Sequence, residues 1–122
     1  MTKQKRIGDL GEALAMQHLL SQGYRILETN WRFSRAEIDI IARLNDMLIF
    51  VEVKTRSYDY FGPPEAFVDD KKEILMADAA YRYMELIEHE SEIRFDIISV
   101  LLRERSEPEI KHFKDAFFPG LE

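Results

Sequence analysis

Residues 36–56 read AEIDIIARLNDMLIFVEVKTR and form the stretch that decides the fold. Two runs in it, residues 36–43 and 47–54, are rich in Ile, Val and Phe, which favour β-strands. Asn45-Asp46, between the runs, is typical of a tight turn. The stretch therefore predicts a β-hairpin with a two-residue loop.

The register of this hairpin follows from its symmetry about the turn. Asp39 should lie directly opposite Glu52, and Glu37 directly opposite Lys54. Because side chains alternate along a strand, all four ionisable groups should share one face of the hairpin. The other face should carry apolar side chains that pack under a helix, namely Ile38, Ile40, Val51 and Val53.

Two opposed carboxylates repel one another unless a proton or a cation relieves the charge. The chain has no cysteine, so a metal would be bound by oxygen or histidine, and oxygen ligands favour Mg²⁺ or Mn²⁺. Lys54 beside such an ion could position a water or stabilise charge on a phosphate. In the alternative interpretation these are exposed strand charges, with Glu37 and Lys54 forming a surface pair worth under about 1 kcal/mol. That interpretation accounts poorly for Asp39 opposite Glu52.

The rest of the chain alternates between helical and strand patterns. Apolar spacing predicts a helix over residues 9–22, which Gly23 ends, and a strand over 24–28. Pro63-Pro64 precedes a second helical stretch that runs to about His89, with an apolar face predicted as Ala66, Ile74, Leu75, Ala77, Ala79, Ala80, Tyr83, Met84 and Ile87. Strands are predicted over 93–102 and 109–113. The order αβββαββ indicates an α/β fold, a mixed central sheet flanked by helices.

Composition limits the classes of protein to consider. With 122 residues, 46% of them hydrophobic, residues 1–122 fit a single domain. No apolar run could span a membrane and no leader peptide is evident, so the cytoplasm is expected. The net charge of −6 argues against nucleic-acid binding, but residues 1–61 carry +1 and residues 62–122 carry −7. A basic face in the first half is therefore still possible.

The hairpin sequence resembles that of the YraN family, which is similar to archaeal Holliday-junction resolvases and the wider PD-(D/E)XK nuclease superfamily. Comparable features recur in order along nearly the whole chain: residues 8–12, Gly23-Tyr24, residues 30–32, Phe61-Gly62, the Lys72 helix, Phe95-Asp96 and Ala116-Phe117. One departure is Ala36, where the family usually has glycine. The resemblance implies a restriction-endonuclease-like fold and a metal-dependent endonuclease acting on DNA.

The resemblance also implies roles for individual residues. Asp39, Glu52 and the Val53 carbonyl would bind Mg²⁺ or Mn²⁺, and Lys54 would be the catalytic lysine. Glu12 would be an acid on the first helix that holds a second metal or a metal-bound water; alternatively, it is a solvated charge near a helix N-terminus.

Other candidates are more open. Arg32, Arg56 and Lys72 could contact nucleic-acid phosphates, or be ordinary solvated charges. Trp31 and Phe33 could stack on bases, although partial burial is the favoured interpretation. Asp96, in an apolar strand, could bind a backbone amide or support Lys54. The histidines (His18, His89 and His112) lack ligand spacing, so a histidine metal site is not expected.

Two functions follow. The first is a metal-dependent nuclease acting on structured or branched DNA, which would act as a homodimer on a two-fold symmetric junction. The second is a non-catalytic module of the same fold that binds nucleic acid or another protein, an interpretation that the acidic second half favours. The intact Asp39, Glu52 and Lys54 favour the first.

Overall fold

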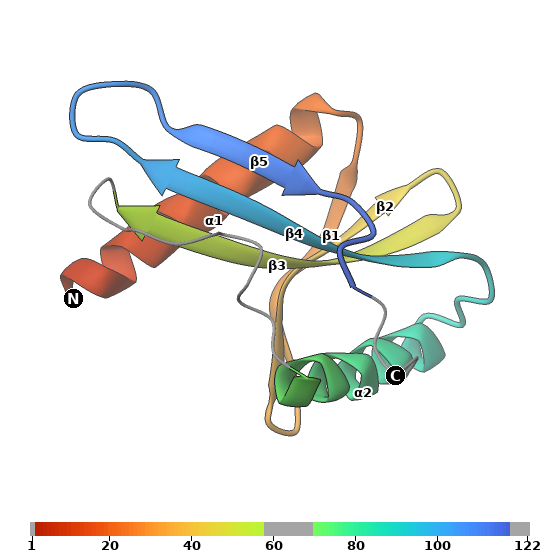
Figure 1. The fold of residues 1–122 in the computed structure, drawn as a ribbon. Helices are drawn as coiled ribbons and strands as arrows, with labels where there is room; N and C mark the ends of the chain where they lie inside the picture. Colours follow the sequence, from red (N-terminus) through yellow and green to blue (C-terminus); the bar gives the residue numbers. More distant parts are fainter. Residues whose placement is uncertain (1, 58–69, 118–122) are drawn as a thin grey trace.

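A computed structural model describes residues 2–57 and 70–117, which form a five-stranded sheet with one helix on each face (Figure 1). The elements are α1 (Lys3–Ser21), β1 (Arg25–Phe33), β2 (Ala36–Leu44), β3 (Met47–Ser57), α2 (Asp70–Leu86), β4 (Ile93–Leu102) and β5 (Glu109–Phe113). The strands lie in chain order, and among these five described strands only the neighbours β3 and β4 are parallel, because α2 connects them. The predicted αβββαββ order and mixed sheet are confirmed.

Helix α1 begins six residues earlier than predicted. The Thr2 hydroxyl caps it by accepting a hydrogen bond from the Lys5 amide at 3.0 Å, a signal the apolar spacing could not reveal. The helix ends where predicted, before Gly23, whose φ of +89° suits glycine. Leu10 and Leu20 fit the apolar spacing from which the helix was predicted, but they are 49% and 57% exposed.

The β2–β3 hairpin turns at Asn45-Asp46 as predicted, with Asn45 in the left-handed region at φ +54°. The predicted register is confirmed from Leu44–Met47 to Ile40–Val51, where the paired ladder stops. Strands β1 and β2 are also antiparallel, and β1 extends five residues beyond the predicted strand end.

Strand β2 bends where it leaves β3. Ile40 and Val51 pack in the cluster beneath α1, whereas Ile38 packs in the cluster beneath α2. The prediction that Ile38 shares a face with Ile40 was therefore wrong, because the alternation of side chains between the two faces of the sheet is interrupted at the bend. Beyond it, the β1–β2 ribbon departs from the sheet and runs down to the start of α2 (Figure 1).

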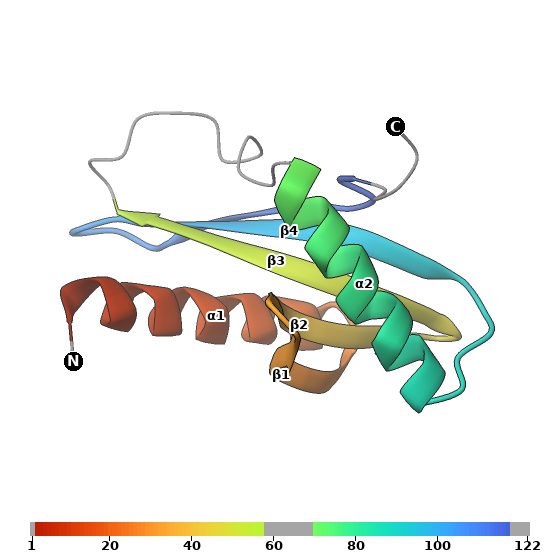
Figure 2. The ribbon, with the colours of Figure 1, turned by 90° about the horizontal axis from the view of Figure 1, so that it is seen from below.

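The second half of the sheet matches the sequence closely. Strands β4 and β5 have the predicted bounds, and α2 ends near the predicted position. Figure 2 shows α1 running along one face of the sheet and α2 crossing near β2 and β3. Ile74 was predicted on the apolar face of α2 but is 57% exposed. The predicted break at Pro63-Pro64 and the predicted contact of Ala66 lie outside the described residues.

No helix in the described ranges has the length and apolar content needed to cross a membrane.

Candidate metal and phosphate site

The candidate site lies at the fork where β2 leaves β3. The β2–β3 ladder ends at the pair Ile40–Val51. Beyond it, the Val53 amide donates a hydrogen bond to Asp39 Oδ2 at 2.8 Å, so a side-chain oxygen takes the place of a backbone carbonyl. The predicted alignment of Glu37 with Lys54 does not form a ladder pair. Glu37 pairs with Arg32 across β1, and Lys54 pairs with Ser99 across β4.

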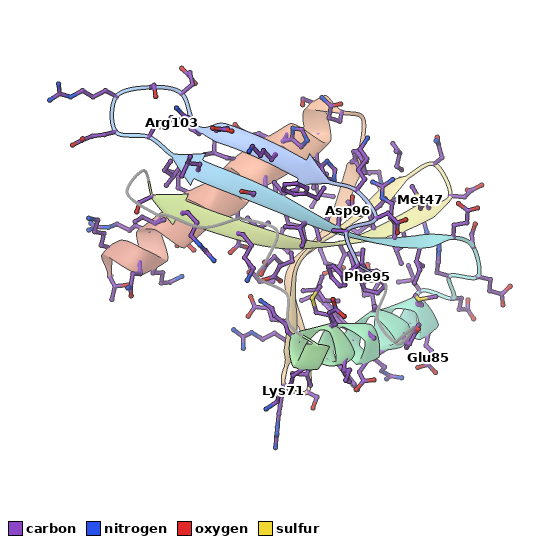
Figure 3. All side chains as sticks on the ribbon, viewed as in Figure 1. Met47, Lys71, Glu85, Phe95, Asp96 and Arg103 are labelled. Carbon is purple, nitrogen blue, oxygen red and sulfur yellow. The ribbon has the colours of Figure 1, made fainter. Side chains whose placement is uncertain are left out.

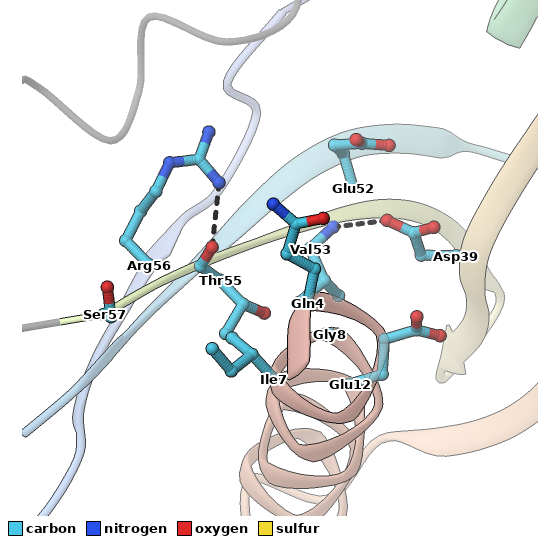
Figure 4. Close-up of a pocket in the computed structure, with 10 residues that line it drawn as sticks. All are labelled: Gln4, Ile7, Gly8, Glu12, Asp39, Glu52, Val53, Thr55, Arg56 and Ser57. Carbon is cyan, nitrogen blue, oxygen red and sulfur yellow. Dashed lines mark hydrogen bonds between the residues drawn. The ribbon is translucent and has the colours of Figure 1, made fainter. Parts of the chain in front are cut away.

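Asp39 and Glu52 form the wall between two pockets. On the α1 side, a pocket of about 400 Å³ is also lined by Glu12, Val53 and Arg56 (Figure 4). On the α2 side, Lys72, Arg35 and Glu37 help to line a smaller pocket of about 260 Å³. Both pockets thus meet at the two carboxylates that the hairpin sequence singled out.

Close packing between α1 and β3 positions Glu12. Its neighbour Gly11 is buried, and a Cβ atom there would overlap the Thr55 side chain. Only glycine permits this approach of helix to strand, so α1 lies close enough for Glu12 to line the pocket. Figure 4 shows Glu12 extending from α1 toward Asp39, while Glu52 lies across the β3 ribbon.

Two lysines bind Glu52, whose carboxylate is buried. Lys72 Nζ from α2 donates to Glu52 Oε1, and Lys54 Nζ lies 3.3 Å from the same oxygen. The Glu52 side chain is 5% exposed, so in the metal-free protein these ammonium groups compensate a charge that water cannot reach. The sequence pattern did not predict the Lys72–Glu52 ion pair, because it joins elements 20 residues apart.

Burial and like charges make Asp39 and Glu12 hard to ionise. Burial, with the nearby charge of Glu52, raises the pKa of Asp39 to about 7, although the Val53 amide partly opposes the rise. Burial also raises the pKa of Glu12, against a hydrogen bond from Asn30, and Glu37 adds to the rise. A cation bound among these groups would relieve the repulsion.

The site shifts the pKa values of the two lysines in opposite directions. Burial lowers the pKa of Lys54, and the charge of Lys72 adds to this effect, while Glu52 opposes it. Burial also disfavours the charged form of Lys72, but the hydrogen bond and negative charge of Glu52, together with Lys54 and Asp39, outweigh burial and raise the pKa of Lys72. Lys72 is therefore held firmly as a cation, whereas Lys54 is the more readily deprotonated.

The donor set fits a hard divalent cation. Glu12, Asp39 and Glu52 all line one pocket, and carboxylate oxygens are the ligands that Mg²⁺ and Mn²⁺ prefer. Within residues 2–57 and 70–117, however, no three acidic or imidazole groups are already arranged as ligands. Binding of one ion by all three carboxylates would therefore require side chains at this fork to move.

The three candidate phosphate-binding residues lie in different settings. Arg56 lines the α1-side pocket and donates to the Thr55 carbonyl at 2.8 Å. Lys72 lines the α2-side pocket. Arg32, on the β1–β2 ribbon, is 75% exposed and lies 2.7 Å from Glu37.

Trp31 and Phe33 differ in their surroundings. The Trp31 ring is half-buried and packs edge-on against Tyr83 at 5.2 Å, as the burial interpretation predicted. Phe33 is 39% exposed.

Asp96, labelled in Figure 3, is buried on β4 and lines neither of the two pockets. It accepts hydrogen bonds from the Asp115 amide at 3.0 Å and from the Arg94 guanidinium at 2.8 Å, and lies 2.7 Å from His112. Asp96 therefore binds a backbone amide, one of the two roles left open by the sequence. Sequence spacing missed that His18 and His112 meet, with 3.2 Å between their ring nitrogens.

Comparison with known proteins gives one consistent family. The profile described as "Uncharacterised protein family UPF0102" matches residues 11–100. A UPF0102 protein of Flavobacterium psychrophilum is 48% identical over 118 residues, which cover 97% of this chain and 98% of the relative. Those of Christiangramia forsetii and Alkaliphilus oremlandii are 42% and 44% identical, over 97% and 93% of this chain and 98% of each relative.

Proposed function

The chain belongs to the UPF0102 family, the YraN family that its hairpin resembles, and we propose that it is a Mg²⁺- or Mn²⁺-dependent nuclease acting on DNA phosphodiesters. The observation that carries the proposal is the fork, where Asp39 and Glu52 form the shared wall of two pockets. Buried carboxylates that repel one another destabilise the fold unless a bound cation offsets their charge. Lys54 lies beside these carboxylates, where it can act on a bound phosphate.

Each residue of the fork has a distinct role in this proposal. Asp39, Glu52 and the Val53 carbonyl would hold the ion, and Glu12 would hold a second ion or orient a water. When bound, such an ion would polarise the phosphate as a Lewis acid and would lower the pKa of a coordinated water. Lys54 stabilises negative charge on the phosphate oxygens as water adds to phosphorus and the bond to the departing sugar oxygen breaks.

The surroundings of the fork support an anionic polymer as substrate. Arg56 lines one pocket, and Arg35 and Lys72 line the other, so cations flank the acids on both sides. The acidic residues that give the chain its charge of −6 come mainly from the second half of the sequence. Structured or branched DNA and a homodimer are proposed from the resemblance to junction resolvases, and a cytoplasmic location accords with the absence of cysteine.

One observation favours a second candidate function, a nucleic-acid or protein-binding module that does not cut. Glu52 is bound by two lysines, and the acids of the described ranges are not arranged as a ready metal site. A chain that had given up catalysis could retain this pairing as a structural feature.

The test is calorimetric titration with Mg²⁺ and Mn²⁺, together with cleavage assays on duplex, flap and four-way-junction DNA. The nuclease proposal expects metal binding that Asp39→Asn weakens, and cleavage that both Asp39→Asn and Lys54→Ala abolish while DNA binding survives. Asp78→Asn, an exposed site on α2, is the matched control and should leave binding and cleavage unchanged. DNA binding with no metal binding would support the module instead, and a monomer by light scattering would count against junction resolution.

A further inference from the structure

Lys72 and Lys54 both compensate the negative charge of Glu52, but only Lys72 is placed so that its ammonium group could move away from Glu52 into solvent. Lys54 lies two residues from Glu52 on the same strand, and its side chain is 13% exposed. Lys72 lies in the first turn of α2 and lines the α2-side pocket, and its side chain is 38% exposed. A long lysine side chain at the rim of a pocket can turn into water at little cost.

The oxygen atom that Lys72 contacts indicates that Lys72 competes with the proposed metal ion for Glu52. Its ammonium donates to Glu52 Oε1, an oxygen of the same carboxylate that the proposed metal would use. An ammonium and a divalent cation cannot both lie against one carboxylate oxygen at contact distance without strong repulsion. The ion pair and a metal bound at this oxygen are therefore alternatives.

We propose that Lys72 is a tethered counter-ion that occupies the metal-binding edge of Glu52 and must be displaced when a divalent metal binds. The inference rests on the proposed function and concerns the regulation of the same site. In the metal-free protein Lys72 stabilises the buried Glu52 charge, and it thereby lowers the affinity for metal. Once displaced, its ammonium is released beside Arg35 and adds to the cationic edge of the α2-side pocket.

The direct test compares Mn²⁺ affinity by calorimetry in the wild type and in Lys72→Met, which keeps the length of the side chain and removes its charge. We expect Mn²⁺ to bind about tenfold more tightly to Lys72→Met, within the usual range for coupled binding events. Lys71→Met is the matched control, because Lys71 is the preceding residue and points away from the sheet into solvent (Figure 3). It should bind Mn²⁺ as the wild type does.

A second measurement needs no metal. Chemical denaturation of metal-free protein should show that Lys72→Met lowers the free energy of unfolding, and that this loss disappears in the Glu52→Gln background. Saturating Mn²⁺ should remove most of the difference in stability between Lys72→Met and the wild type. A loss of equal size in both backgrounds would mean that Lys72 stabilises α2 in some other way, and would overturn the inference.

The outcomes separate the inference from the proposed function. Equal or weaker Mn²⁺ affinity in Lys72→Met, beside clear binding by the wild type, overturns the counter-ion and leaves the nuclease proposal standing. Binding by Lys72→Met alone supports the inference strongly. No Mn²⁺ binding by either protein overturns the metal site itself, and the inference with it.

Discussion

Replacing Asp39 by asparagine should stabilise the fold at alkaline pH. Asparagine is nearly isosteric, and its side-chain oxygen can still accept the hydrogen bond from the Val53 amide. It removes the negative charge that burial and Glu52 make unfavourable. Asp39→Asn thus separates the charge of this position from its structural hydrogen bond.

The magnitude follows from the pKa of Asp39, which is about 7 in the folded protein against 3.8 for an ordinary aspartate in water. Between these values the folded state binds more protons than the unfolded state, so the free energy of unfolding falls as pH rises. The difference of about three pKa units corresponds to about 4 kcal/mol above pH 7. Because Asp39, Glu52 and Glu12 share the repulsion, we expect about 2–4 kcal/mol.

The assay is urea denaturation of metal-free wild type and Asp39→Asn at intervals from about pH 4 to about pH 8. The two proteins should be nearly equal in stability at the acid end, and the variant should be the more stable at the alkaline end. Asp78→Asn, on the exposed face of α2, should follow the wild type. A variant that is less stable at alkaline pH, or a difference that does not change with pH, would refute the reasoning.

Three further predictions concern Lys54 at the fork, Gly11 in α1 and Asp96 in β4. Lys54→Met should reduce cleavage at least 100-fold in single-turnover assays while DNA affinity falls less, since its ammonium acts on developing charge; equal loss of both would contradict that role. Gly11→Ala should lower stability by about 1–3 kcal/mol in thermal melts, because its methyl group overlaps Thr55, and adding Thr55→Ala should restore part of the loss. Asp96→Ala should cost about 3–5 kcal/mol at neutral pH, because it leaves Arg94 without its buried partner. Although burial opposes the effect, hydrogen bonds lower the pKa of Asp96, so its contribution should disappear as pH falls through the folded-state pKa; a loss of stability that persists in acid would point to packing instead.

The sequence predicted those parts of the fold that depend on local pattern. Alternation and turn chemistry predicted the turn at Asn45-Asp46 and the β2–β3 register between this turn and the pair Ile40–Val51. They also predicted the bounds of β4 and β5. The position of Asp39 and Glu52 at one site also follows from the register. The placement of these two carboxylates depends only on two strands joined by a short turn, so it could be predicted from local sequence.

The parts that the sequence could not predict depend on contacts between distant elements. The alignment of Asp39 with Glu52 as a ladder pair fails because β2 bends away, and nothing in residues 36–43 specifies that bend. Lys72 reaches Glu52 only because α2 packs over the end of the β1–β2 ribbon. His18 and His112 meet because the end of α1 lies under β5. Spacing along the chain carries no information on such contacts.

The hydrogen bond from Val53 to Asp39 makes one backbone amide a reporter on the chemistry of the fork. In a regular ladder, a strand carbonyl would hold that amide, and its exchange with solvent would depend only on the opening of the sheet. Here the acceptor is a carboxyl group whose charge varies with pH and with any bound cation. The Val53 ¹⁵N–¹H resonance should therefore shift near pH 7, and its exchange protection should change on titration with Mg²⁺, so that one peak in an NMR spectrum follows the state of the site.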